Sequence, residues 1–224
     1  MPSIKTITPI LGGNYYHIFN RGANRQNIFF LPKNYYYFLK LLKNFLGEYV
    51  YFLAYTLLPN HFHLIIKVRD EIEGTVLSKK NGFIAPHKIE GTVISKENGS
   101  LITDETEIGK LVSNQFKRLF ITYAMAINNQ ENRVGNLFEP KYKRLLIENQ
   151  EYLEYAIFYT HFNPEKHGFT NDFKKYRFSS FKAILGKGKT SINRDFVLNL
   201  FGGLEEFKNY HNVLHEERTE IILE

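Results

Sequence analysis

The sequence predicts an α+β domain in which antiparallel strands are backed by packed helices. A β-prone run, 49–58, is followed by the turn residues Pro59-Asn60 and a second run, His61–Val68, a pattern typical of a β-hairpin. Two longer segments, 33–46 and 108–128, repeat apolar residues with helical spacing. A chain of 224 residues is long enough to bury a core around such elements.

The other expected elements follow the chain order. Residues 14–22 are aromatic and β-branched and end in turn residues, so they predict the first strand. Residues 141–147 predict a last strand with a basic start. Residues 151–162 predict a helix that begins after Asn149 as N-cap and ends before Pro164. Two further helical patterns, 193–201 and 204–215, lie in the C-terminal region.

An internal duplication interrupts this order. Residues 72–82 recur as 89–99, at an offset of seventeen positions. Two copies are too few for a solenoid, and each has a short β-prone centre bounded by glycine. We therefore expect a projecting insertion at about 70–107, either a β-hairpin or a flexible loop, without a chemical role.

Two histidines stand on the second arm of the expected hairpin. Because side chains alternate along a strand, His61 and His63 point to one face, while Phe62 and Leu64 point to the opposite, apolar layer. Neutral imidazole is a good ligand for divalent metals, so the pair is a candidate metal site. On these residues alone, the favoured interpretation is two histidines that only bond to neighbours or water, and the motifs that follow along the chain change that balance.

Composition narrows the classes of function. Lys and Arg number 29 against 23 Asp and Glu, a net charge of +6 that favours a polyanionic partner. The absence of cysteine excludes disulfides, zinc-thiolate sites and thiol nucleophiles. No run approaches the ~20 apolar residues that span a bilayer, and residues 1–13 lack the apolar region of a signal peptide. We expect an intracellular, cytoplasmic protein with no membrane partner.

Tyrosines provide a candidate nucleophile. Tyr155, Tyr159 and Asn163 are spaced four apart and share a helix face. A tyrosine hydroxyl is a poor nucleophile at its usual pKa of about 10, and a divalent cation that polarises the target phosphorus is the simplest help. With fifteen tyrosines in the chain, spacing alone does not select one of them.

Taken in order, several motifs resemble those of the single-tyrosine HUH transposases, especially the REP-associated tyrosine transposase branch. Each motif is weak alone, and their order over residues 13–211 is the specific signal. The motifs are Tyr16-His17-Ile18-Phe19-Asn20-Arg21-Gly22, Leu58-Pro59-Asn60-His61-Phe62-His63-Leu64, Gly135-Asn136-Leu137-Phe138-Glu139-Pro140-Lys141-Tyr142-Lys143, Tyr159-Thr160-His161-Phe162-Asn163-Pro164 and, more weakly, Tyr176-Arg177-Phe178-Ser179-Ser180-Phe181.

The resemblance implies a fold and a site. The fold is a ferredoxin-like or RRM-like antiparallel sheet with the His-x-His on a central strand. The catalytic domain would cover residues 1–170, followed by a C-terminal helical extension, 171–224. His61 and His63 would bind Mg²⁺ or Mn²⁺, Tyr159 would be the nucleophile, and Asn163 would complete the metal site.

The implied activity is metal-dependent cleavage and rejoining of single-stranded DNA beside a hairpin, through a 5′-phosphotyrosine and a free 3′-OH. Candidate DNA contacts are Arg21, Arg25, Lys141, Lys143 and Arg144. One alternative is a non-catalytic module that binds single-stranded nucleic acid on an RRM-like sheet. Another is a replication-initiation or relaxase-type nickase, which usually carries an additional domain. A monomer and a homodimer are equally compatible with the sequence.

Overall fold

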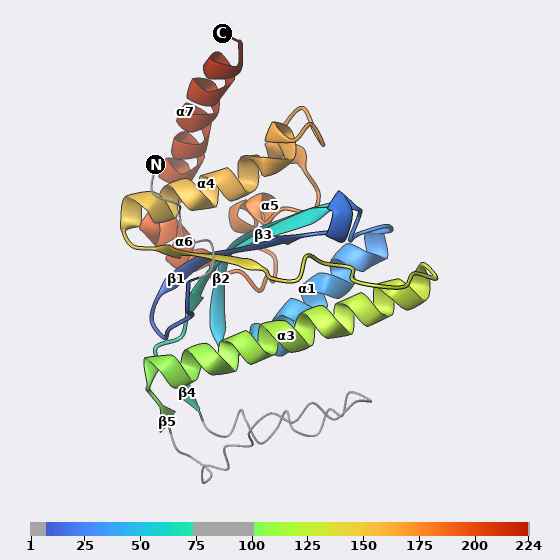
Figure 1. The fold of residues 1–224 in the computed structure, drawn as a ribbon. Helices are drawn as coiled ribbons and strands as arrows, with labels where there is room; N and C mark the ends of the chain where they lie inside the picture. Colours follow the sequence, from blue (N-terminus) through green and yellow to red (C-terminus); the bar gives the residue numbers. More distant parts are fainter. Residues whose placement is uncertain (1–7, 74–100, 224) are drawn as a thin grey trace, which may run out of the picture.

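The computed structural model describes residues 8–73 and 101–223 (Figure 1). Most of the duplicated segment, with the expected hairpin or loop, lies outside the described residues. Two short strands, β4 (Ile72–Glu73) and β5 (Leu101–Ile102), pair antiparallel at its two ends.

The main sheet has four strands in the order β2-β3-β1-β6, and all neighbouring strands are antiparallel. Their bounds are β1 Tyr15–Arg21, β2 Val50–Leu58, β3 His61–Val68 and β6 Lys143–Ile147. Together with helices α1 and α3, they follow one another as βαββαβ, the ferredoxin-like arrangement. The predicted hairpin is therefore confirmed, and its His-x-His lies on a central strand.

Helices cover both faces of this sheet (Figure 1). In the view of Figure 1, α1 and α3 lie below the sheet, and α4 lies above it with α7 beyond. The bounds are α1 Pro32–Leu46, α3 Glu105–Gln130, α4 Gln150–Lys166, α5 Phe181–Leu185, α6 Arg194–Leu200 and α7 Leu204–Leu223. Among the described residues, none of the helices is long and apolar enough to cross a membrane.

Alternation along β3 divides its side chains between the two layers. Phe62 is fully buried, with its ring centroid 5.1 Å from that of Phe38 in α1 and 5.8 Å from that of Phe120 in α3. His63 points to the other face, where its ring lies 6.3 Å from that of Tyr159 in α4. The period of two thus places an apolar layer under the sheet and the histidines beneath α4.

Three predicted boundaries were wrong by a few residues. α3 begins at Glu105, three residues earlier than expected, because the carboxylate of Asp104 accepts a hydrogen bond from the backbone N–H of Glu107 at 2.7 Å and caps the helix. β6 begins at Lys143, where its pairing with Phe19 of β1 begins. α7 continues beyond its predicted end at His215 to Leu223.

The end of α4 needs a larger correction. Asn149 caps its start as predicted, with its side-chain oxygen accepting from the N–H of Tyr152 at 2.8 Å. The helix does not stop before Pro164, however, but continues to Lys166. Proline disfavours helix at the preceding residue, and here tertiary packing overrides that preference, since Asn163 and Pro164 are both buried. Asn163 is therefore inside the helix.

The C-terminal helices share the core of the sheet. Ser179 forms an isolated bridge with Thr56 of β2, and Ile192 forms one with Phe52 of the same strand. Phe173 and Phe207 are fully buried in the same apolar cluster as the strands. The division of the chain at residue 170 stays a prediction, and the segment after it is packed against β2.

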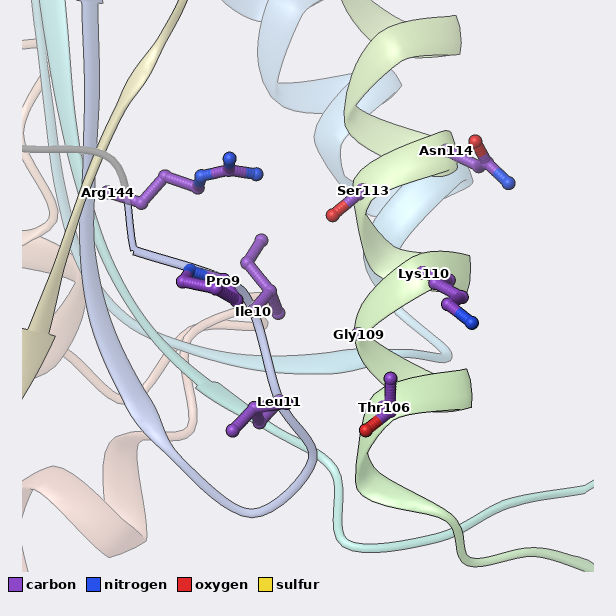
Figure 2. Close-up of a pocket in the computed structure, with 9 residues that line it drawn as sticks. All are labelled: Pro9, Ile10, Leu11, Thr106, Gly109, Lys110, Ser113, Asn114 and Arg144. Carbon is purple, nitrogen blue, oxygen red and sulfur yellow. The ribbon is translucent and has the colours of Figure 1, made fainter.

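Gly109 allows the N-terminal segment to approach α3 closely (Figure 2). A Cβ at this position would lie 1.7 Å from the carbonyl oxygen of Ile10. Gly109→Ala should gain about 1 kcal/mol of helix propensity. It should lose more by forcing the backbones apart, so we expect a net destabilisation of about 1–3 kcal/mol in urea unfolding. Gly188→Ala is the matched control, because a Cβ there meets no atom within 4 Å, and it should leave stability nearly unchanged.

Candidate active site

The site is built where α4 crosses the end of β3. The ring centroids of His61 and His63 are 5.3 Å apart, with the planes at 84°. α4 and its C-cap residue bring two side chains to them: the ring of Tyr159 lies 6.3 Å from that of His63, and the ring of the C-cap residue His167 lies 5.0 Å from that of His61. Tyr159 and His167 thus meet the histidine pair in the folded chain, although they are 96 or more positions away from it in the sequence.

Each histidine of the pair is held through its Nδ1 atom. Nδ1 of His61 lies 2.7 Å from the side-chain oxygen of Asn60, and Nδ1 of His63 lies 2.8 Å from Nε2 of His17. An amide oxygen only accepts, so Nδ1 of His61 carries the proton and its Nε2 holds a lone pair. Neither Nε2 atom of the pair has a hydrogen-bond partner among the described residues.

Burial keeps these imidazoles neutral. It lowers the pKa of His61 to about 4, with smaller contributions from His167 and the Arg21 guanidinium. Burial also sets the pKa of His63 well below its usual value of 6.5, helped by the neighbouring His17. Both rings are therefore uncharged at neutral pH, which is the form that binds a metal.

Tyr159 lies beside this pair with its hydroxyl held by a cation. Nζ of Lys166 donates a hydrogen bond to the Tyr159 hydroxyl at 3.0 Å and lies 4.7 Å from the ring centroid. The next tyrosine on the helix face, Tyr155, stacks on Tyr159 with ring centroids 6.1 Å apart. The hydroxyl of Tyr155 instead accepts a hydrogen bond from Arg218 of α7, so only Tyr159 combines contact with His63 and contact with a lysine.

Asn163 lies between the two α4 contacts to the histidine pair. It is one turn after Tyr159 and one turn before His167, so the three share the helix face that meets β3. Its side-chain nitrogen donates to the Tyr159 carbonyl at 2.7 Å. Its side-chain oxygen is buried and has no hydrogen-bond partner in the described part of the chain. An unpaired buried oxygen costs about 1–3 kcal/mol unless a ligand satisfies it.

The predicted metal ligands are two imidazoles and one amide. Within residues 8–73 and 101–223, no group of three or more His, Asp or Glu side chains is placed to hold a metal ion. Among the described residues, the two Nε2 atoms, the side-chain oxygen of Asn163 and the ring of His167 have no hydrogen-bond partner. Nitrogen and neutral oxygen donors fit a divalent cation, so these residues are compatible with the group that the sequence predicts.

Several residues of this site escaped prediction from the sequence. His17 contacts His63 only because β1 pairs with β3, although its alternation with Phe19 and Arg21 on β1 was a usable signal. His167 was missed because the helix was predicted to end before Pro164. The Lys166 contact follows from the same correction.

Two of the predicted DNA contacts lie at the histidine end of the sheet. Arg21 is directly opposite His61 in the β1–β3 register, and its guanidinium pairs with the carboxylate of Glu139. Arg25 is exposed in the turn after β1, with a left-handed φ of +61°. Arg21 must release Glu139 before it can bind a phosphate, whereas Arg25 lies in an exposed turn.

The other three predicted contacts are divided by strand alternation. Lys143 is opposite Phe19, which is itself opposite His63, so Lys143 lies on the histidine face of β6. Lys141 is exposed just before the strand. Arg144 lies on the opposite face, beside a hollow of about 420 Å³ between the N-terminal segment and α3 (Figure 2). All five basic residues stay predicted contacts, and the structure puts Arg144 away from the histidine pair.

Comparison with solved structures finds a likeness of fold. No protein-family model matches this chain, and no curated protein matches it. Its fold is similar to that of a solved structure described as "Structure of the REP associates tyrosine transposase bound to a REP hairpin". The TM-score is 0.48 and the sequence identity is 17%. The alignment covers 81% of this chain and 84% of that chain. At this level the likeness says nothing about the chemistry of the site, which depends on the side chains that line it.

Proposed function

We propose that this protein cleaves and rejoins single-stranded DNA, with Tyr159 as nucleophile and a divalent cation as cofactor. One observation carries the proposal: the Tyr159 ring lies beside His63, and within the part of the chain that the structure describes the Nε2 atoms of His61 and His63 and the side-chain oxygen of Asn163 have no hydrogen-bond partner. The proposal gives one role, cleavage of a phosphodiester with the help of a cation, to a tyrosine, two histidines and an amide oxygen from distant parts of the chain. The net charge of +6 suits a polyanionic substrate.

The cation, Mg²⁺ or Mn²⁺, would be held by Nε2 of His61, Nε2 of His63 and the side-chain oxygen of Asn163. When bound, it supplies positive charge that neutralises the scissile phosphate and the departing 3′ oxygen. The protein supplies the geometry. The bonds at both Nδ1 atoms fix the rings, and the helix fixes Asn163 relative to Tyr159.

The chain's own residues carry the covalent step. The Tyr159 hydroxyl oxygen forms a bond to phosphorus while the bond from phosphorus to the 3′ oxygen breaks. The phenol proton passes to solvent, and the departing oxygen takes up a proton from solvent, which leaves a 5′-phosphotyrosine and a free 3′-OH. Lys166 holds the attacking oxygen with a charged donor, which stabilises negative charge as the proton leaves. Attack by another 3′-OH reverses the step and rejoins DNA.

The substrate is a DNA hairpin with a single-stranded flank. The motif resemblance implies this shape, and the basic residues at the histidine end of the sheet suit its phosphates. Arg25 and Lys141 are exposed and Lys143 is half-buried, while Arg21 must first leave Glu139. Phosphate contacts of this kind position a strand without reading its sequence.

The non-catalytic alternative has less support. RRM-like modules stack bases on aromatic residues of an open sheet face. Here α4 lies over the histidine face and α1 and α3 lie over the other (Figure 1). His17 on the central strand β1 is 6% exposed, which leaves little ring surface at that position for a base.

The first test is formation of a covalent adduct. Wild-type protein incubated with labelled hairpin DNA and Mn²⁺ is expected to give a protein–DNA species that survives denaturation in detergent. EDTA should abolish the adduct while DNA binding through surface lysines and arginines persists. Denaturing gel electrophoresis measures the adduct, and fluorescence anisotropy measures binding.

A double variant, His61→Ala with His63→Ala, controls for nonspecific effects of the chelator. It should lower adduct formation by at least about 100-fold, because it removes two of the three donors for the cation. An adduct yield in the double variant equal to that of wild type with Mn²⁺ would show that the cleavage does not use this site.

A further inference from the structure

A third histidine, outside the predicted ligand set, is bonded to the histidine pair. His17 is on β1, the neighbour of β3, and is 6% exposed. Its Nε2 lies 2.8 Å from Nδ1 of His63, and the two ring centroids are 5.0 Å apart with the planes at 32°. Phe19 covers both rings, with centroids 4.9 Å from His17 and 5.5 Å from His63. The contact between the two imidazoles is buried.

A single proton lies in this contact, and its position decides what His63 can bind. If Nε2 of His17 carries the proton, then Nδ1 of His63 accepts, and neutral His63 carries its own proton on Nε2. No lone pair is then left for a cation. If Nδ1 of His63 carries the proton, Nε2 of His17 accepts, and Nε2 of His63 holds a free lone pair. Only the second arrangement is compatible with metal binding.

His61 makes the corresponding contact at Nδ1 with a side-chain oxygen that can only accept a hydrogen bond. Nδ1 of His61 faces the side-chain oxygen of Asn60, which accepts and cannot donate. Each histidine of the pair therefore has an acceptor available at Nδ1 and no partner at Nε2 among the described residues. Metal-binding histidines commonly donate their second ring N–H to such an acceptor.

We propose that His17 is a positioning residue that accepts the Nδ1–H of His63 and so keeps the Nε2 lone pair of His63 directed at a divalent cation. The inference rests on the proposed function only in that His63 binds the cation. His17 is not a ligand itself, because its Nε2 is occupied by His63. Its Nδ1 then carries its own proton, which fixes the tautomers of both rings.

Two substitutions separate the acceptor from the bulk of the side chain. His17→Phe keeps an aromatic ring but removes the acceptor, and we expect the affinity for Mn²⁺ to fall about 10- to 100-fold. His17→Gln keeps an amide oxygen that accepts, and it should restore the affinity to within a few-fold of wild type. The free Mn²⁺ signal in electron paramagnetic resonance measures binding without DNA, and circular dichroism confirms that both variants are folded.

Nuclear magnetic resonance reads the tautomer directly. In ¹⁵N-histidine-labelled wild type saturated with Mg²⁺, we expect the proton on Nδ1 of His63 and none on Nε2 of His17. In folded His17→Phe without metal, the proton of His63 should move to Nε2. A proton on Nε2 of His17 in the loaded wild type would overturn the inference, even if His17→Phe failed to fold.

The outcomes distinguish this inference from the proposed function. If the wild type binds Mn²⁺ but gives no DNA adduct, and His17→Phe binds Mn²⁺ more weakly, the results support the role of His17 and contradict DNA cleavage. If the wild type gives an adduct and folded His17→Phe binds Mn²⁺ with unchanged affinity, the results support cleavage and contradict the role of His17. Absence of any Mn²⁺ binding to wild type would contradict both.

Discussion

Replacing Tyr159 by phenylalanine is expected to abolish the covalent DNA adduct, a loss of at least about 10³-fold, because no oxygen remains to attack phosphorus. The ring should stay where it is, since its contacts with His63 and Tyr155 are made by the aromatic face and edge. Removal of one hydroxyl changes no charge on the surface, so DNA affinity should change by less than about 3-fold. Denaturing electrophoresis and anisotropy on the same samples give both numbers.

Tyr155→Phe is the matched control for this experiment. Tyr155 lies one turn earlier on the same helix face and stacks on Tyr159, but its hydroxyl binds Arg218 of α7 rather than Lys166. We expect this variant to keep most of the adduct yield. Persistence of the adduct in Tyr159→Phe with its loss in Tyr155→Phe would exchange the roles of the two tyrosines.

The β2–β3 hairpin was predictable because its signals are local. The turn Pro59-Asn60 and the flanking β-prone runs define the β2–β3 hairpin, and a period of two decides which side chains of β3 share a face. The end of α4 was not predictable in the same way. The preference against helix before Pro164 is local, whereas the packing that overrides it comes from Phe162 and from residues far along the chain.

The site divides along the same line. Because His61 and His63 are two residues apart on one strand, their common face followed from the sequence. Their partners did not, because His17 is 46 residues away and reaches His63 only after β1 pairs with β3. Tyr159 was assigned by motif resemblance. Its contact with His63 depends on the packing of α4 against β3, which the sequence does not specify locally.

A second buried histidine network holds α4 in this position. His161 of α4 contacts His211 of α7, Nδ1 to Nε2, at 2.9 Å. Nδ1 of His211 donates to the carbonyl of Phe207 at 2.8 Å, so its Nε2 must accept and Nδ1 of His161 must donate. Nε2 of His161 in turn accepts from the hydroxyl of Ser180 at 2.8 Å. All four ring nitrogens of His161 and His211 are thus hydrogen-bonded, and both rings are fully buried.

His211→Leu should therefore destabilise the protein strongly at neutral pH. It leaves the His161 N–H without its buried acceptor, at about 1–3 kcal/mol, and removes one hydrogen bond to the Phe207 carbonyl, at about 0.5–1.5 kcal/mol. We expect a loss of about 3–4 kcal/mol in urea unfolding at pH 7.5. Val213→Ala, on an exposed position of the same helix, should change stability by less than about 0.5 kcal/mol.

The deficit of His211→Leu should shrink as the pH falls. Burial lowers the pKa of His211 to about 3, against about 6.5 in the unfolded chain. Between these pH values the unfolded wild type is protonated at His211, whereas the folded protein is not. The stabilising contribution of this histidine is therefore complete above pH 6.5 and falls by about 1.4 kcal/mol per pH unit towards pH 3. The leucine variant lacks this dependence, and the gap at pH 5 should be roughly 2 kcal/mol smaller than at pH 7.5. A constant gap would mean that His211 is not held neutral in the folded protein.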